Sequence, residues 1–177
     1  MNLSTSIKTV YFKKYVDFKG RASRSEFWWA IGFYYAILFV IYFVGYLIYP
    51  EYLDAGFLEN TSLDNVANVL NLITFLPTLA VYYRRLHDIN RSGWWFWLWL
   101  PPFIIFIIVM IYTMLTTLPI EVITAETAEP DLWLLFNNNA FIISLISWVL
   151  PMIYVSFYLP LKKGDKEANR FGEAPID

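Results

Sequence analysis

The chain of 177 residues contains no cysteine and only one histidine, His87. Without thiols it can form no disulfide, and it offers neither a thiolate metal ligand nor a cysteine nucleophile. A single imidazole also argues against a structural zinc site, whose four ligands are mostly cysteine and histidine. Charged residues are scarce, at 16% of the chain. We therefore expect no metal, no cofactor and no disulfide framework.

Apolar residues are abundant instead. They make up 58% of the chain, and aromatic residues alone account for 20%, including eight tryptophans. Soluble domains usually contain about 45–50% apolar residues, so this excess does not fit one small water-soluble core. A lipid bilayer is the natural solvent for it. The composition predicts an all-α polytopic membrane protein that forms a single membrane domain over residues 1–177.

Four long runs predict four transmembrane helices, at about 27–49, 66–83, 100–120 and 140–161. Runs of about 20 residues cross the roughly 30 Å of bilayer hydrocarbon. The first run is too long for the core of a cleavable signal peptide and is interpreted as a retained anchor. A tryptophan-rich stretch precedes the third span, and Pro101-Pro102 predicts a kink between the two. Pro151 predicts a second kink in the last span.

The second span carries a polar stripe at spacings of three and four residues, which places its members on one helix face. The stripe consists of Asn68, Asn71, Thr74 and Thr78. Amides and hydroxyls at such positions usually bond to neighbouring helices within the bilayer. We interpret the stripe mainly as a helix contact, and a polar transport pathway is the alternative.

Before the first span, apolar residues recur at helical spacing and lysines flank them. The apolar positions are Ile7, Val10, Tyr11, Tyr15 and Phe18. This pattern predicts an amphipathic helix in the membrane interface that ends near Gly20. The alternative is an aromatic-rich tail packed on the rest of the protein. Ser23 and Glu26 then match a capping box, in which each side chain bonds to the backbone N–H of the other residue, so the first span should begin near Ser23.

The distribution of charge predicts the topology. All thirteen lysines and arginines fall in residues 1–26, 84–93 and 162–177, whereas residues 50–65 and 121–139 carry eight acidic residues and no basic one. Basic residues concentrate in cytoplasmic segments of membrane proteins. We therefore expect both termini and the 84–93 loop in the cytoplasm, and the two acidic loops on the other side of the membrane.

Three short motifs fall within the basic segments. They read F-K-G-R-A-S-R-S-E-F-W at 18–28, R-R-L-H-D-I-N-R-S-G-W-W at 84–95, and N-R-F-G at 169–172. In these motifs the chain resembles the bacterial inner-membrane family catalogued as domain of unknown function 805. Members of that family often have a Gly-Pro pair before N-R-F-G, where this chain has Glu167-Ala168. The resemblance implies a small multi-span protein of the bacterial inner (plasma) membrane and supplies no activity.

The charged residues of the motifs allow two interpretations. They could form a network of salt bridges that connects the N-terminal segment, the middle loop and the tail, or some of them could bind lipid headgroups or a partner protein. The candidate residues are Arg21, Arg24, Arg84, Arg85, His87, Asp88 and Arg170. Structural roles are expected for Gly20, Ser23, Glu26, Ser92, Gly93, Trp94, Asn169, Phe171 and Gly172.

Catalysis is the weaker interpretation of the same residues. His87-Asp88 lacks the further histidine and acidic ligands of a metal hydrolase, and Ser92 lacks a histidine base at a recognisable triad spacing. We therefore name no catalytic residue and expect that the protein is not an enzyme. An enzyme that acts on a lipid headgroup, with His87 as acid or base, stays open as an alternative.

Three functions compete on this basis. The preferred one is binding of anionic lipid or a protein partner through the arginine-rich cytoplasmic face. The alternatives are a small oligomeric transporter or channel and the headgroup enzyme. Membrane lipids are the expected partners, and a homo-oligomer or a complex with another membrane protein is compatible with the sequence. No nucleic acid partner is expected.

Overall fold

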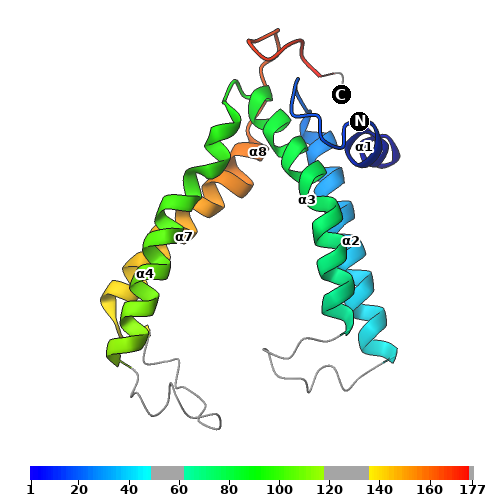
Figure 1. The fold of residues 1–177 in the computed structure, drawn as a ribbon. Helices are drawn as coiled ribbons and strands as arrows, with labels where there is room; N and C mark the ends of the chain where they lie inside the picture. The colour runs from blue at the N-terminus through cyan, green and yellow to red at the C-terminus, as the bar shows by residue number, and fades with distance from the viewer. Residues whose placement is uncertain (49–61, 118–135, 176–177) are drawn as a thin grey trace. The chain divides into compact units, whose positions relative to one another are not determined.

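A computed structural model describes residues 1–48, 62–117 and 136–175. Most of the two acidic loops lies outside these residues. Within them the regular structure is helical, and four helices are long and apolar enough to cross a membrane: Arg24–Ile48, Ser62–Asp88, Gly93–Thr116 and Asn139–Leu161. The predicted all-α class with four spans is thereby confirmed (Figure 1).

The chain forms two compact units, which are described separately. One contains Met1–Gly93 and Pro160–Asp177, and the other contains Trp94–Leu159. The expectation of one membrane domain with the span limits given above stays a prediction.

The first unit is built on two long helices, α2 (Arg24–Ile48) and α3 (Ser62–Asp88), which run antiparallel and side by side (Figure 1). Tyrosine hydroxyls connect them. Tyr42 donates to Asp64 Oδ1 at 3.0 Å, and Tyr34 donates to Asn71 Oδ1. Asn71 belongs to the predicted polar stripe, so this member of the stripe makes a helix contact.

The N-terminal segment is helical but shorter than expected. Helix α1 (Leu3–Lys8) continues as a wider π-helical turn, η1 (Thr9–Lys13). Asn2 caps α1 by accepting a hydrogen bond from Thr5 N at 2.9 Å. The prediction that this helix ends near Gly20 is wrong, because the backbone leaves the helical conformation after Lys13. The segment lies against α2 and α3, where the Tyr11 hydroxyl donates to Ala30 O at 3.1 Å.

A proline in the middle of α3 explains another of these contacts. Pro77 has no N–H, so the carbonyl of Ile73, four residues earlier, loses its usual partner in the helix. The Tyr15 hydroxyl donates to this carbonyl. Membrane helices tolerate proline where neighbouring groups satisfy the freed backbone atoms. Tyr15 therefore completes the hydrogen bonding of α3 and attaches the N-terminal segment to it.

Helix α3 also extends further than predicted. The sequence suggested a loop from Arg84 onward, but the helix continues through Asp88. No helix breaker intervenes, and the turn comes at Asn90, whose φ of 57° is left-handed. Asparagine tolerates this conformation and is found at helix C-termini. The first two arginines and the histidine-aspartate pair of the middle motif thus project from a rigid helix rather than from a loop.

The second unit pairs α4 (Leu100–Thr117) with α7 (Asn139–Ile153). Phe106 and Phe141 are the buried centre of this pair, and the Phe106 ring stacks on Trp148 with centroids 5.1 Å apart. The Asn138 side chain caps α7 by accepting from Ala140 N at 2.9 Å.

Proline positions shape both ends of this unit. The tryptophan-rich stretch forms a tight 3-10 helix, η3 (Gly93–Trp99), and Pro101-Pro102 then fall in the first turn of α4. The missing N–H groups cost little there, because the N–H groups of a first turn have no partner within the helix. After Pro151, α7 passes into a π-helical turn, η4 (Tyr154–Tyr158), and then α8 (Leu159–Leu161).

Candidate functional site

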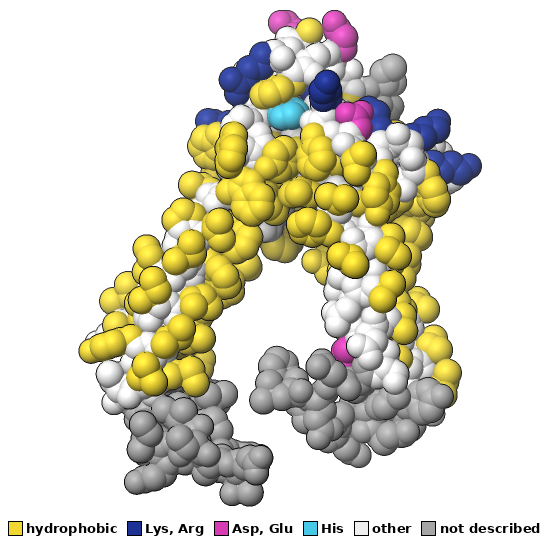
Figure 2. All heavy atoms as spheres, in the orientation of Figure 1, with side chains coloured by type: hydrophobic (Ala, Val, Ile, Leu, Met, Phe, Trp, Pro, Cys, Tyr) yellow, Lys and Arg dark blue, Asp and Glu magenta, His cyan; other side chains and the backbone are white. Residues whose placement is uncertain are grey.

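The three sequence motifs meet at one end of the first unit, where α3 ends and the C-terminal tail crosses it. Backbone groups join the segments: Ala22 N donates to Arg84 O at 3.0 Å, and Asp165 N donates to Asp88 O at 2.9 Å. Lysine and arginine side chains gather at this end, while hydrophobic side chains cover most of the helices below it (Figure 2). The motifs are thus close in space, although almost 150 residues separate the first from the last.

At the centre lies a group of five charged residues, which we call the arginine clasp: Arg21, Glu26, Arg84, Arg85 and Asp88. Asp88 accepts hydrogen bonds from two arginines, on Oδ1 from Arg21 Nε at 3.0 Å and on Oδ2 from Arg85 Nη1. Arg84 Nη1 pairs with Glu26 Oε1 at 2.6 Å. All five side chains are buried. Buried charges persist when they are paired, and each of these arginines has a carboxylate partner, although Nε and Nη2 of Arg84 are buried without a hydrogen bond to any described residue.

Two of these arginines also hold the backbone around them. A guanidinium has five N–H donors in a planar fork, so it can serve a carboxylate and several carbonyls together. Arg21 and Arg85 do so with Asp88 and with six carbonyl oxygens, those of Ala22, Pro160, Lys162, Asp165, Glu167 and Gly172. Four of the six belong to the tail, and a fifth, that of Pro160, belongs to α8 just before it. The clasp therefore fixes the path of the tail through its backbone, largely independent of tail side chains.

Burial changes the interpretation of these residues. The exposed fractions of Arg21, Arg84 and Arg85 are 5%, 0% and 1%. Their guanidiniums face the protein interior, so in this arrangement they are not displayed to a lipid headgroup. The structure brings together four of the seven candidate residues in one cluster of ion pairs, which also includes Glu26. Arg24 is exposed outside the clasp, and Arg170 donates to Asn90 O at 3.1 Å.

Glu26 explains why only half of the predicted capping box forms. Ser23 Oγ accepts a hydrogen bond from Glu26 N at 3.2 Å, as the side chain of a helix N-cap does. Helix α2 accordingly begins at Arg24, directly after Ser23. The Glu26 carboxylate, instead of turning back to the Ser23 backbone, accepts from Arg84. An ion pair with a buried arginine outcompetes a second capping bond, because the arginine would otherwise be buried without a counter-charge.

The N-R-F-G motif forms a tight turn that closes over His87. Asn169 and Gly172 exchange backbone hydrogen bonds of 3.1 and 2.9 Å, and Gly172 has a φ of 126°, a conformation that favours glycine. The Asn169 side chain accepts from Phe171 N at 2.9 Å and donates to His87 O at 3.0 Å. The turn thereby docks on the last turn of α3.

The imidazole of His87 is held between the tail and the N-terminal segment. Its ring stacks on Phe171 with centroids 3.9 Å apart, and Arg170 covers the Phe171 ring at 4.7 Å. His87 Nδ1 lies 3.1 Å from Gly20 O, and it carries the hydrogen there because a carbonyl oxygen only accepts. Asp88 is engaged by two arginines instead. His87 and Asp88 are therefore adjacent in sequence but do not act as a pair.

Two glycines allow close approach around the clasp. A Cβ on Gly93 would lie 2.0 Å from the Tyr83 ring, which itself packs edge-on against Phe18 at 5.4 Å. A Cβ on Gly164 would lie 1.9 Å from Asp88 Oδ2. Both positions therefore require glycine. Ser92 directly precedes Gly93, outside regular structure, and Trp94 begins the second unit with 79% of its surface exposed.

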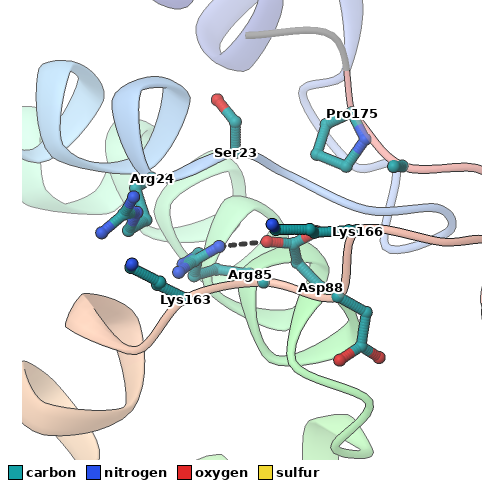
Figure 3. A pocket seen from close by; sticks show the side chains of 10 residues that line it. Ser23, Arg24, Arg85, Asp88, Lys163, Lys166 and Pro175 are labelled. Atoms are coloured by element: carbon teal, nitrogen blue, oxygen red, sulfur yellow. Dashed lines mark hydrogen bonds and ion pairs between the residues drawn. The ribbon is translucent and has the colours of Figure 1, made fainter.

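Beside the clasp is a pocket of about 400 Å³, which we call the cationic pocket. Arg24, Lys163 and Lys166 are exposed on its wall, and their side chains surround the buried Arg85–Asp88 pair (Figure 3). In the part of the chain that the structure describes, no hydrogen bond or ion pair engages the three cationic groups. Within the same residues, no group of three or more histidine or acidic side chains is placed to hold a metal ion.

Comparison with known proteins identifies the family. Residues 15–119 match the family described as "Protein of unknown function (DUF805)". The chain belongs to the DUF805 family. It is 34% identical over 100 residues to inner membrane protein YhaH of Escherichia coli K12, which covers 56% of this chain and 77% of that protein. Inner membrane protein YhaI of the same organism is 37% identical over 100 residues, covering 56% and 75%. No solved structure matches.

This DUF805 member is therefore an integral inner-membrane protein. It has four helices that are long and apolar enough to cross a membrane, and both relatives are inner membrane proteins. The family match includes all five residues of the arginine clasp and ends before the tail that the clasp holds.

Sequence reasoning missed four residues of this DUF805 site: Asn90, Lys163, Gly164 and Lys166. Asn90 could have been found, because an asparagine after a helical arginine-rich stretch is a plausible left-handed end residue. The other three gave no local signal. Their positions depend on how the tail crosses α3, which the clasp decides through contacts distant in sequence.

Proposed function

We propose that this protein binds the phosphate group of anionic phospholipids in the cationic pocket. The observation that carries the proposal is the contrast between two sets of cations. The arginines of the clasp are buried and paired, whereas Arg24, Lys163 and Lys166 are exposed and have no partner in the described part of the chain. The free cations therefore replace Arg84 and Arg85 as the expected headgroup ligands.

The chemistry of the pocket suits phosphate. The guanidinium of Arg24 can donate two parallel hydrogen bonds to phosphate oxygens, and Lys163 and Lys166 add mobile point charges. Two acidic residues line the pocket, but Asp88 is neutralised by two arginines and Asp165 Oδ2 accepts from Asn169 at 3.0 Å. The pocket thus keeps a net positive charge.

The position of the pocket suits a lipid rather than a soluble phosphate compound. Arg24 is the first residue of α2, and Lys163 comes two residues after the end of the last apolar helix at Leu161. The ends of apolar helices are where the hydrocarbon of a bilayer gives way to headgroups. The charge distribution of the sequence predicts that this face lies in the cytoplasm, and on that prediction the ligand would come from the inner leaflet.

Lipid binding to the full chain tests the proposal. Native mass spectrometry would compare phosphatidylglycerol with phosphatidylethanolamine for the wild type and two double variants. Lys163→Gln/Lys166→Gln removes charge from the pocket, and Lys19→Gln/Lys162→Gln removes equal charge from exposed positions that do not line it. At about 1 kcal/mol for each cation near an anionic surface, the pocket variant should bind phosphatidylglycerol roughly thirtyfold more weakly.

The control variant should retain near-normal affinity and the preference for phosphatidylglycerol. Equal losses in the two variants would mean that diffuse charge, and not the pocket, attracts the lipid, and the proposal would fail. It would also fail if the pocket variant kept its lipids and instead lost a co-purifying protein, since the face would then bind a protein partner.

A further inference from the structure

A second cavity lies in the first unit, away from the cationic pocket. It measures about 530 Å³, a size common for small-molecule sites, and lies between the N-terminal segment, α2 and α3. We call it the apolar groove. Its walls include Ile7 and Tyr15 from the N-terminal segment, Phe33 and Ile37 from α2, and Leu70 and Ile73 from α3.

The apolar groove offers a ligand no free hydroxyl. Every hydroxyl that lines it donates to an acceptor of the protein: Tyr11 to Ala30 O, Thr74 to Leu70 O, Tyr15 to Ile73 O, and Tyr34 to Asn71 Oδ1. Only ring faces and aliphatic carbon remain for contact. A polar ligand would lose its water without gaining hydrogen bonds, which is costly, so the groove selects hydrocarbon.

The charge next to the groove indicates what kind of molecule carries that hydrocarbon. Lys8 and Lys13 are exposed on the same N-terminal segment that contributes Ile7 and Tyr15, and the first acidic residue of the chain is Asp17. A ligand with an apolar tail in the groove would place its other end near these lysines. An anionic group at that end complements them.

We infer that the apolar groove holds one acyl chain of an anionic phospholipid whose phosphate lies near Lys8 and Lys13. This site shares no lining residue with the cationic pocket and relies on other cations, so the two proposals can be tested independently. The N-terminal segment then acts as part of a lipid site, with Tyr15 attached to the Ile73 carbonyl that Pro77 leaves free.

Photo-crosslinking tests this inference on the full chain in vesicles. The probe is phosphatidylglycerol with a photoreactive group in one acyl chain, and mass spectrometry identifies the labelled peptides. Label should concentrate on the peptides that contain Ile7–Tyr15 and Leu70–Thr74. Leu70→Trp fills the groove and should reduce this label about tenfold. Leu72→Trp adds the same ring at a position that is 78% exposed outside the groove, and should leave the label unchanged.

A charge variant tests the headgroup. Lys8→Gln/Lys13→Gln should keep the groove label but remove the preference for phosphatidylglycerol over an equivalent phosphatidylethanolamine probe. The cationic-pocket variant Lys163→Gln/Lys166→Gln should leave groove labelling as in the wild type, which separates the two sites.

Label spread evenly around α2 and α3, or unchanged by Leu70→Trp, would reduce the groove to ordinary bilayer contact and overturn the inference. Should Leu70→Trp fail to fold, as judged by size-exclusion chromatography, Ile37→Trp fills the groove from the opposite wall. Unchanged labelling of that variant would overturn it equally.

Discussion

At the scale of single residues, Asp88 is the residue on which the arginine clasp depends. It accepts hydrogen bonds from Arg21 and Arg85, and a backbone N–H from the tail bonds to its carbonyl. Its neighbour His87 packs by ring stacking instead. His87 therefore contributes to packing, whereas the Asp88 carboxylate beside it is the shared ion-pair partner of two buried guanidiniums.

Asp88→Ala should be among the most destabilising single substitutions in this chain. It leaves Arg21 and Arg85 buried without their counter-charge, and breaking such a pair costs about 3–5 kcal/mol. Denaturant unfolding in detergent micelles would measure the loss. Glu173→Ala removes an exposed acidic side chain of the tail and should change stability by no more than about 0.5 kcal/mol. Similar stabilities for the two variants would contradict the assignment of Asp88 as the shared acceptor.

Tyr15→Phe should destabilise the protein through a single backbone carbonyl. The substitution leaves Ile73 O without the hydroxyl that replaces the N–H missing at Pro77, at a cost of about 1–3 kcal/mol. Pro77→Ala restores that N–H, so Tyr15→Phe should cost clearly less in the Pro77→Ala background. A double-mutant cycle on unfolding free energies measures the coupling. A coupling near zero would show that the tyrosine and the proline act separately.

At the scale of elements, the end of α3 and the C-terminal tail hold each other in position through direct contacts. The tail carbonyls accept from clasp arginines, the N-R-F-G turn covers His87, and Gly164 passes against the Asp88 carboxylate. The tail has almost no regular secondary structure, so these contacts rather than its own backbone bonding determine its path.

Gly164→Ala should displace the tail from α3. Its methyl group would lie 1.9 Å from Asp88 Oδ2, so either the clasp or the tail must shift. We expect a loss of about 1–3 kcal/mol, the usual cost of overpacking, and faster proteolysis of the tail. Gly32→Ala provides the matched control, because a Cβ there meets nothing within 4 Å and alanine favours the interior of α2. A tail equally resistant to protease in both variants would contradict the close packing.

At the scale of the whole molecule, the segregation of charge is the dominant feature. All thirteen lysines and arginines lie in residues 1–26, 84–93 and 162–177, whereas residues 50–65 and 121–139 contain eight acidic residues and no basic one. The energy of this arrangement is electrostatic and does not depend on the detailed packing of the helices.

Topology reporters test the proposed orientation. Fusions of a cytoplasm-active reporter near Asp54 and Glu126 should be silent, whereas a fusion at the C-terminus should be active. A periplasm-active reporter should give the reverse pattern. Activity of the cytoplasmic reporter at either loop would refute the orientation and move the cationic pocket to the other leaflet.

The four spans and their order followed from the sequence alone. In a bilayer each span must satisfy its backbone hydrogen bonds internally, so a long uncharged run specifies a helix without reference to the rest of the chain. The cap at Ser23 is equally local, because its partner is three residues away.

Only the tertiary structure decided which cations are buried and which are free. Arg84 and Arg24 have the same side chain, but Arg84 pairs with Glu26 inside the protein and Arg24 borders the cationic pocket. Arg84 and Glu26 are 58 residues apart in the sequence, as are Tyr15 and Ile73. Arg21 and Gly172 are 151 residues apart. Local patterns specify helices and charge, whereas the burial of a charge depends on which distant segment packs against it.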